Sequence, residues 1–586
     1  MSMPLPQSDT GRRRITQSDG GSWLRTVMVD GGLAAQWRRR WPVLCVVAVA
    51  ILALAPAMWR GVPSNIDLWN HYRFALPFYD SLCAGDISPG WLAESNGGYG
   101  DPSFRFYPPG TYYLLAGGRA LTGQWYAASL LVFTLLSVLG GLGVYFWARA
   151  SLSRWAAMWA GIFYTLMPYH LNELYQAFLL AEYAGCAVLP FAFAFTERVC
   201  RRGRMRDVAG LAASFAALVL THLPLTVIGG LALLVYALLR MEWGKRLATT
   251  WKLALGVVLG LAASAFYWTT MLAELRWIKA NNFQPDLSVD YRYNFLFSTF
   301  STDNLNVWWM NIIAFATLGM MLPGIALLHR GSRARMRRRR ALSAATLLLL
   351  FSFLMATPAS RPLWMLLSPL REAQFPWRWL TLVSLAGSIV AAAAIHFWLA
   401  KARGRGRPLA LLIAGGVIIS LTLTASHIIC EAKYLPSTEF TAALESIPGS
   451  PSISYWLPVW ASLSPRRMPR HVEAGERNVS TGAWDAERRT FEVAAGRQTE
   501  ARVRTLYYPH WRATAAGRAL SVRAADDGAL LISLPPEAVT VELEFQEPPR
   551  VRVASLLSAL GAISICILLI FSLRGAGRYE YDSAAA

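Results

Sequence analysis

Apolar residues along this chain gather in runs of about twenty, which is the length that one helix needs to cross the hydrocarbon core of a bilayer. Short polar or basic stretches separate these runs. The pattern therefore predicts a polytopic α-helical membrane protein. About twelve transmembrane helices are expected, at 41–59, 126–148, 155–171, 179–197, 208–223, 225–240, 252–273, 307–328, 341–358, 378–400, 408–429 and 552–573.

Basic residues between the runs predict how these helices are oriented. Lysine and arginine are enriched in cytoplasmic loops. With twelve helices, all of the basic patches fall on one side: 38–40, 149–154, 198–206, 240–252, 330–340, 401–407 and 574–578. We therefore expect both termini to be cytoplasmic. The opposite, outer side receives the longer loops 60–125, 274–306 and 359–377 and the segment 430–551.

The ends and the segment 430–551 differ from the helical pattern. Residues 1–40 are polar and basic and predict a disordered cytoplasmic tail, and 574–586 form a second, short tail. The first run ends in a sequence that mimics a signal-peptidase site, but it follows a long polar stretch, which favours an uncleaved anchor. In 430–551 apolar and polar residues alternate between Gly, Pro and Asp, which predicts a small extracytoplasmic β-sandwich-like domain before the last helix.

Composition narrows the class further. The chain has 586 residues, of which 55% are hydrophobic and 16% charged, against about 25% charged in soluble domains. Its net charge of +21 lies in short patches between apolar runs, which indicates membrane topology and no nucleic-acid partner. The six cysteines contain no CxxC pair, so their spacing supports neither a zinc site nor a redox motif.

The first outer loop, 60–125, carries the densest candidate chemistry. Asp67 and His71 are four apart in a helix-compatible run, so a helix places them on one face. Such a pair can form a general base or part of a divalent-metal site. The alternative is an interfacial helix with ordinary polar decoration. Glu94, Asp101 and Arg105 follow within the same loop, around a glycine-rich turn, and add to the density of polar side chains.

Two ionisable side chains are expected at the outer ends of predicted helices: Glu182 near the start of the fourth and His222 at the end of the fifth. Ionisable groups at membrane depth are costly, which makes them functional candidates. The alternatives are a structural ion pair with a loop arginine for Glu182 and a hydrogen bond across the helical hairpin for His222.

Three arginines are candidates for binding a phosphate. Arg371 and Arg378 lie in LREAQFPWRW between the ninth and tenth helices, and Arg292 lies in the polar, aromatic loop 274–306. Guanidinium groups bind phosphate in a bidentate manner. The alternative for the LREAQFPWRW arginines is an aromatic belt with snorkelling side chains.

Several segments resemble those of a known family. They are GDISPGWLAESNGGYGDPSFRFYPPGTYY, LAEYAGCAVLPF, LVLTHLPL, QFPWRW and LYYPHWRATAAGRAL. In this order they resemble bacterial multispanning proteins related to the GT-C superfamily of glycosyltransferases, one branch of which carries the label 6-pyruvoyl-tetrahydropterin synthase-related membrane protein. The resemblance covers about residues 41–573, of which 41–429 form the GT-C-like transmembrane domain. Nothing in the sequence supports pterin chemistry.

The resemblance implies a GT-C-like fold in the bacterial inner membrane and an inverting transfer of sugar from a polyprenyl-phosphate-linked donor. The acceptor is an envelope glycan, lipid or protein. Asp67 matches the acidic first-loop position that activates the acceptor or binds a divalent metal, Mg²⁺ or Mn²⁺, with Glu94 or Asp101 as a second carboxylate. Arg371 and Arg378 match donor-phosphate contacts. The chain lacks a paired acid beside Asp67, where His71 lies instead.

Two other classes of function stay open. A transporter or flippase predicts charged residues inside several helices, whereas the ionisable groups here gather at outer helix ends. A non-enzymatic scaffold for envelope polysaccharide assembly would use the β-rich domain as its binding site. Transfer activity with a polyprenyl-phosphate sugar distinguishes the enzyme from both.

Overall fold

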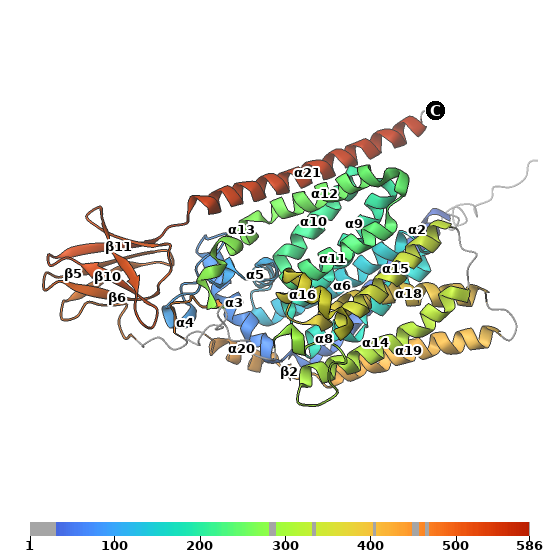
Figure 1. The fold of residues 1–586 in the computed structure, drawn as a ribbon, viewed down its shortest axis with the longest axis horizontal. Coiled ribbons are helices and arrows are strands. Elements are labelled where there is room, and N and C mark those ends of the chain that lie inside the picture. The colour runs from blue at the N-terminus through green and yellow to red at the C-terminus, as the bar shows by residue number, and fades with distance from the viewer. Residues whose placement is uncertain are drawn as a thin grey trace, which may run out of the picture.

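The computed structural model describes residues 31–279, 289–330, 336–401, 406–447, 456–462 and 468–584. Most of the predicted tail, 1–30, lies outside this range, as do the basic residues 331–335 and 402–405. The molecule has a body of packed helices, here called the helical body, and a β-domain that projects from one end of it (Figure 1).

All twelve predicted ranges fall on helices. Two ranges are each split into two helices, α7 with α8 and α12 with α13. The first helix begins ten residues earlier than the predicted span. The helices are α2 (Gly31–Arg60), α6 (Trp125–Arg149), α7 (Arg154–Thr165), α8 (Pro168–Tyr175), α9 (Leu180–Arg202), α10 (Met205–Thr221), α11 (Leu223–Arg240), α12 (Arg246–Ala263), α13 (Ala265–Glu274), α14 (Leu305–Arg330), α15 (Met336–Ala356), α18 (Leu380–Lys401), α19 (Gly406–Cys430) and α21 (Pro549–Ala584).

Fewer of these helices meet a strict test of length and hydropathy. Within the described residues, seven are long and apolar enough to cross a membrane, or eight if the bent pair 340–356 and 358–366 forms one span. A helical membrane protein is therefore the finding, and the number twelve stays a prediction.

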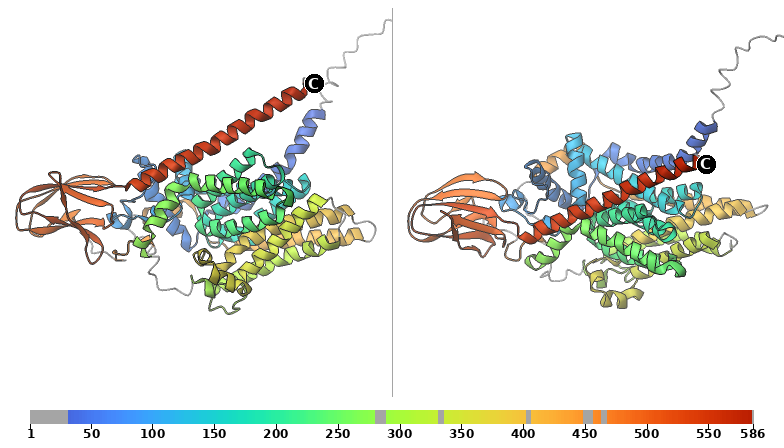
Figure 2. Two further views of the ribbon diagram at one scale, coloured as in Figure 1. Left: turned by 45° about the horizontal axis from the view of Figure 1, so that its top comes forward. Right: turned by 90° about the horizontal axis from the view of Figure 1, so that it is seen from above.

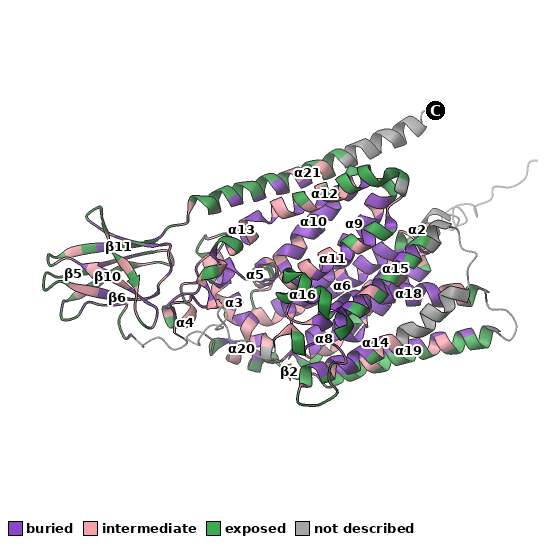
Figure 3. Ribbon diagram, viewed as in Figure 1, coloured by how far each residue is buried: buried purple, intermediate pink, exposed green. Residues whose placement is uncertain are grey.

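Burial separates central from peripheral helices. The span at Pro376–Ala400 is 83% buried, whereas the span at Pro549–Phe571 in α21 is 22% buried. Figure 3 shows exposed residues along α19 and α21 and buried residues in the centre. The exposed side chains on α21 are large and apolar, such as Leu556, Leu560 and Phe571. A bilayer is the surrounding that suits such a surface.

Residues 60–125, which the sequence predicts to be the first outer loop and which are called the first loop below, are largely helical. They contain α3 (Ile66–Cys83), α4 (Ser95–Gly98) and α5 (Gly110–Thr122). A short ribbon fixes where α3 begins: β1 (Val62–Pro63) pairs antiparallel with β2 (Tyr434–Leu435). The ribbon joins the ends of α2 and α19, so the start of α3 is held at the rim of the helical body.

The predicted β-rich domain is confirmed as two antiparallel sheets. One has the order β3-β6-β10-β9 and the other β4-β5-β11-β7-β8. Their apolar faces share one core, which includes Val503, Ile532, Phe491 and Val541. The strands are β3 (Val472–Glu473), β4 (Val479–Trp484), β5 (Arg488–Val493), β6 (Thr499–Leu506), β7 (Trp511–Ala515), β8 (Arg518–Leu520), β9 (Val522–Ala524), β10 (Ala529–Leu534) and β11 (Val539–Phe545).

The start of the segment 430–551 does not belong to the sandwich. Its helix α20 (Ser437–Glu445) packs on the helical body, because Phe440 lies edge-on against Tyr72 at a ring distance of 5.1 Å. The last turns of α21 and the start of α2 lie at the end of the helical body opposite the β-domain (Figure 2).

Candidate functional site

Asp67 lies in the first turn of α3, where the helix dipole stabilises a negative charge. Its side chain is partly exposed and accepts a hydrogen bond from Asn70 Nδ2 at 3.1 Å. Burial raises its pKa, while the Asn70 hydrogen bond and the nearby positive charge of Arg378 oppose that shift. Asp67 forms no ion pair with any described residue, so its carboxylate is partly desolvated and has no ionic partner among them.

His71 does not pair with Asp67, although both lie on the predicted helix. The backbone N–H of Leu180 donates to its Nε2 at 3.1 Å, so Nδ1 carries the proton and donates to the Tyr112 hydroxyl at 2.9 Å. Burial lowers the pKa of His71 to about 4. The predicted Asp67–His71 dyad is therefore not formed, because the imidazole is turned into the helical body and held there in its neutral form.

Glu182 and Arg378 form a buried ion pair across 196 positions of sequence. Arg378 Nε donates to Glu182 Oε2 at 2.8 Å, and Tyr169 donates to Glu182 Oε1 at 3.0 Å. The second guanidinium nitrogen of Arg378, Nη1, donates to the carbonyl of Ala373 at 2.5 Å. The pair joins α9 to the FPWR turn and follows the structural alternative named for Glu182.

His222 lies beside this pair and also begins a helix. Its Nδ1 accepts from the backbone N–H of Leu225 at 3.2 Å, so His222 caps the N-terminus of α11. Its Nε2 is 3.9 Å from Glu182 Oε2. The LTHLP motif therefore caps a helix locally, in addition to placing His222 beside the Glu182–Arg378 pair.

The three predicted phosphate-binding arginines do not converge. Arg371 is exposed and donates to the carbonyls of Trp364, at 3.3 Å, and Met365. Arg292 is bound to Asp290 at 2.6 Å, and its side chain is 49% exposed. Only Arg378 lies near Asp67, so a shared site of Arg371, Arg378 and Arg292 is not formed.

Glu94 lies far from Asp67. Glu94 is exposed at the start of α4 and lies close to Asp80. The pKa of Asp80 is raised mainly by burial and next by the negative charge of Glu94. Asp80 is thirteen positions from Asp67 on α3, which corresponds to about 20 Å. The predicted metal pair Asp67–Glu94 is therefore not brought together. No cluster of three His, Cys, Asp or Glu side chains suited to a metal occurs within the described residues.

Asp101 shapes the first loop. It is 1% exposed, and its Oδ1 accepts from the Ser103 backbone N–H at 2.7 Å and from the Ser103 hydroxyl. Gly100 has a φ of +84°, and a Cβ there would lie 2.3 Å from the Trp91 ring. The GGYGDP turn therefore lets the loop fold back on Trp91, and Asp101 is a structural residue.

Trp91 and Tyr99 insert the first loop into the β-domain. Trp91 is fully buried in the sandwich core, with its ring 5.5 Å from that of Trp511 and edge-on to it. The backbone N–H of Leu506 donates to the carbonyl of Tyr99 at 2.6 Å. The first loop and the β-domain are thus one packed unit, which the sequence did not reveal.

Arg105 belongs to a buried ionic network that also went unpredicted. Its Nε and Nη2 donate to the two carboxylate oxygens of Glu274 at 2.5 and 2.8 Å. Glu274, at the end of α13, also accepts from Tyr508 at 2.7 Å and His510 at 2.9 Å. We call this set the Glu274 network; its members are Arg105, Glu274, Tyr508, His510, Glu547 and Arg550. It connects the first loop, α13, the β-domain and α21. The LYYPHW segment, which contains Tyr508 and His510, was the sequence feature that could have pointed to this network.

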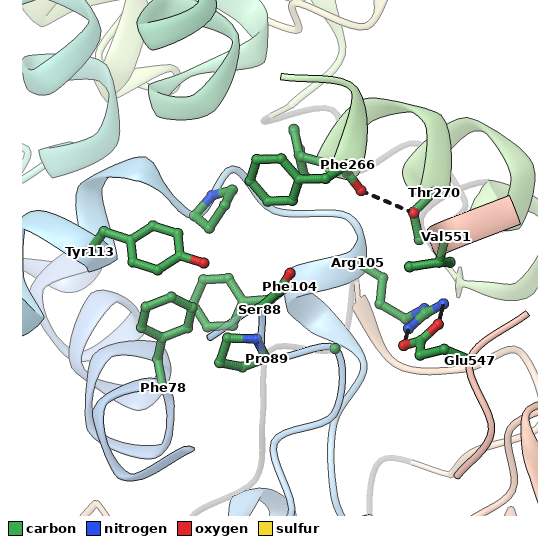
Figure 4. A pocket seen from close by; sticks show the side chains of 13 residues that line it. Phe78, Ser88, Pro89, Phe104, Arg105, Tyr113, Phe266, Thr270, Glu547 and Val551 are labelled. Atoms are coloured by element: carbon green, nitrogen blue, oxygen red, sulfur yellow. Dashed lines mark hydrogen bonds and ion pairs between the residues drawn. The ribbon is translucent and has the colours of Figure 1, made fainter. Parts of the chain in front are cut away.

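A small cavity lies beside Arg105. Figure 4 shows Arg105 paired with Glu547 on one side and the rings of Phe78, Phe104 and Tyr113 on the other. Its volume is about 40 Å³, and a water molecule needs about 10–15 Å³ on this measure. The cavity takes a few water molecules and is too small for a sugar ring.

Several solved structures are similar to this chain. The Archaeoglobus fulgidus oligosaccharyltransferase in its apo form is 14% identical and aligns over 69% of this chain and 58% of its own, with a TM-score of 0.43. ArnT from Cupriavidus metallidurans bound to undecaprenyl phosphate is 19% identical, over 70% and 69% of the chains, with a TM-score of 0.41. The arabinofuranosyltransferase AftD from mycobacteria is 18% identical, over 69% and 27%, with a TM-score of 0.44.

Among curated proteins, none matches the sequence of this chain. One family model does match, over residues 104–433, and its description reads "6-pyruvoyl-tetrahydropterin synthase related domain; membrane protein". The match covers more than half of the chain and includes Arg105, Glu182, His222 and Arg378, whereas Asp67 and the sandwich lie outside it. The chain belongs to the family of 6-pyruvoyl-tetrahydropterin synthase-related membrane proteins.

Proposed function

We propose that this protein is a membrane glycosyltransferase of the GT-C type, in the bacterial inner membrane with both termini in the cytoplasm. It transfers a sugar from a polyprenyl-phosphate-linked donor to an envelope glycan, lipid or protein at the outer face. The observation that carries the proposal is Asp67, a partly buried carboxylate with a raised pKa and no ionic partner among the described residues. A carboxylate whose pKa is raised is a stronger base, which suits it to accept a proton.

In the proposed reaction, Asp67 removes the proton from the acceptor hydroxyl. The acceptor oxygen attacks the anomeric carbon while the bond from that carbon to the phosphate oxygen breaks. The phosphate leaves with the electron pair, on the face opposite the attack, so the anomeric centre is inverted. Asp67 then holds the transferred proton and releases it to solvent.

Arg378 is the proposed contact for the leaving phosphate. Its Nε and Nη1 are held by Glu182 and by a backbone carbonyl, while its Nη2 has no hydrogen bond among the described residues. Glu182 thereby fixes the direction of the guanidinium, and Nη2 is the atom left to meet a phosphate oxygen. A charge fixed in place before reaction stabilises developing negative charge without reorganisation.

The divalent metal expected from the resemblance finds no fitting donor set in the described residues. Glu94 lies near Asp80, and Asp80 is about 20 Å from Asp67 by the helix geometry given above. We therefore assign no step to a metal held by these two carboxylates.

The test is a transfer assay with the full chain in lipid nanodiscs, using a radiolabelled polyprenyl-phosphate sugar and envelope acceptors. Asp67→Asn is expected to abolish most of the transfer. Asp80→Asn, which changes an exposed carboxylate of the same helix, is the matched control and is expected to retain it. Full transfer by Asp67→Asn would show that another group is the base.

A transporter or flippase for lipid-linked saccharides is the second candidate, and one observation favours it. On α8, both ring nitrogens of His170 and one carboxylate oxygen of Glu173 are buried without a hydrogen-bond partner in the part of the chain that the structure describes. Buried ionisable groups within a helical body are typical of transport pathways. Movement of a labelled lipid-linked sugar across liposomes in the absence of any acceptor would favour this candidate over the transferase.

A further inference from the structure

Three nitrogen-rich side chains lie together on the β-domain, where α4 of the first loop covers it. Arg489 is on β5, Arg504 is on β6 and His471 directly precedes β3. Arg504 Nη2 is 2.9 Å from His471 Nδ1, and Arg489 Nη1 is 3.3 Å from the carbonyl of Arg504. We call these three residues the cationic cluster. No carboxylate in the described chain lies within 4.0 Å of any of them.

The hydrogen bond between Arg504 and His471 fixes which nitrogens can still donate. An arginine has only donors, so His471 Nδ1 is the acceptor and its proton is on Nε2. Arg504 Nε is buried and has no hydrogen-bond partner within the described ranges. The cluster therefore presents N–H donors, on Arg504 Nε and His471 Nε2, that have no acceptor among the described residues.

Arg489 adds a buried positive charge to the cationic cluster. It is 1% exposed and lies between the rings of Trp484 and Trp511, at 4.8 and 5.1 Å. Its hydrogen bonds to carbonyl oxygens are long, at 3.3 and 3.4 Å. Burial lowers the pKa of Arg489 to about 10; the Glu94 carboxylate opposes the shift and the Arg504 charge adds to it. A buried charge without an ionic partner is costly, which favours an anion nearby.

The first loop borders the cluster. Glu94 is exposed and lies close enough to influence Arg489 and His471, but it forms no ion pair with a described residue. A Cβ on Gly98, whose φ is +84°, would be 3.4 Å from Arg504 Nε. Trp484 provides an aromatic wall, with its ring 4.4 Å from that of His471.

We propose that the cationic cluster binds an oxyanion carried by an envelope glycan, either a phosphate or a sugar carboxylate. The guanidinium of the half-buried Arg504 and His471 Nε2 donate to the anion, Arg489 supplies positive charge beneath them, and Trp484 packs against the attached sugar. Glu94 competes for the same positive charges. This site does not involve Asp67 and does not require transferase activity; it rests on the proposed function only for the placement of the β-domain at the outer face.

The experiment measures thermal unfolding of the full chain in detergent, followed by intrinsic tryptophan fluorescence. Sodium phosphate, sodium glucuronate, sodium chloride and glucose are compared at matched ionic strength. A ligand that binds only the folded state raises the unfolding midpoint with its concentration. A rise with phosphate alone assigns a phosphate ligand, a rise with glucuronate alone assigns a sugar carboxylate, and a rise with both assigns a shared oxyanion site.

Variants make the test specific. Arg504→Gln and His471→Gln are each expected to remove the anion-dependent rise. Arg523→Gln, which breaks an exposed ion pair with Glu500 on the same domain, is the matched control and keeps it. Glu94→Gln is expected to tighten anion binding several-fold, which a purely structural cluster does not predict. The proposal is overturned if neither anion raises the midpoint, if Arg504→Gln and His471→Gln respond as the wild type does, or if Glu94→Gln weakens the response.

Discussion

The Glu274 network makes a quantitative prediction about how the β-domain is held to the helical body. The change is Glu274→Gln, which keeps the shape of the side chain and removes its charge. Glu274 is fully buried and binds Arg105, Tyr508, His510 and Arg550. Removing it leaves the 2%-exposed guanidinium of Arg105 with Glu547 as its remaining ionic partner.

The magnitude follows from this geometry. Removing one partner of a buried ion pair costs about 3–5 kcal/mol, and the lower value applies because Glu547 still pairs with Arg105. About 3 kcal/mol corresponds to roughly a 100-fold increase in the population in which the first loop and β-domain have separated from α13. Burial alone would raise the pKa of Glu274, but hydrogen bonds from Arg105 and His510 hold it well below its usual range. The contribution is therefore fully present at pH 7 and is lost only as strong acid protonates Glu274.

The assay is hydrogen exchange of the full chain at pH 7, read at the backbone amides of residues 91–107. Where opening is fast relative to exchange, the exchange rate follows the open population, so these amides should exchange roughly 100-fold faster in Glu274→Gln. Arg523→Gln is the control, because an exposed pair contributes about 0–1 kcal/mol. Unchanged exchange in Glu274→Gln would mean that the network does not hold the domains together.

Three further predictions concern other parts of the molecule. Burial raises the pKa of Glu487 to about 7, and the negative charges of Asp86 and Glu547 add to the shift. Between pH 4.5, the ordinary pKa of a glutamate, and pH 7, the folded state therefore holds a proton that the unfolded chain has released. The stability of the folded state should fall as the pH rises through this range. Glu487→Gln should remove this fall and stabilise the β-domain at pH 8 by about 1–3 kcal/mol in a denaturant titration; an unchanged pH profile would show that Glu487 titrates normally. Arg378→Gln should destabilise the helical body by about 3–5 kcal/mol in an SDS titration. The double variant Arg378→Gln with Glu182→Gln should lose less stability than the two single variants added together, and additive losses would show that the two side chains do not form an ion pair. Trp91→Ala should lower the free energy of unfolding of the β-domain by about 3–5 kcal/mol and make the first loop more sensitive to protease. Unchanged cleavage would mean that Trp91 does not stabilise the shared core.

The hydropathy pattern predicted where helices lie but not where they break. The range 155–171 is broken before Pro168, which begins α8 as its first residue, and proline is favoured at that position. The range 252–273 is broken at Ser264, whose hydroxyl donates to the carbonyl of Gly260 at 2.9 Å. Both signals are single residues within long apolar runs, and a window of about twenty positions averages over them.

The candidate site was harder to predict because its pairings join distant parts of the chain. The sequence predicted Glu182 and Arg378 as separate candidate residues, and no motif around either position indicates that the two form an ion pair. His71 shares a helix with Asp67, but the direction of its side chain is set by Leu180 and Tyr112, which a helical spacing argument does not include. The alternation in 430–551 predicted strands, whereas the contribution of Trp91 to their core depends on tertiary packing.

The most direct test of the proposed function is the rate of sugar transfer by wild type, Asp67→Asn and Asp80→Asn at saturating donor. A positioned general base contributes about 100- to 10,000-fold, so Asp67→Asn should lose at least 100-fold in kcat with little change in the KM for the donor. Asp80→Asn should retain the wild-type rate. An Asp67→Asn rate within a few fold of an active wild type would contradict the role of Asp67, and absence of transfer by the wild type with every polyprenyl-phosphate sugar would contradict the transferase itself.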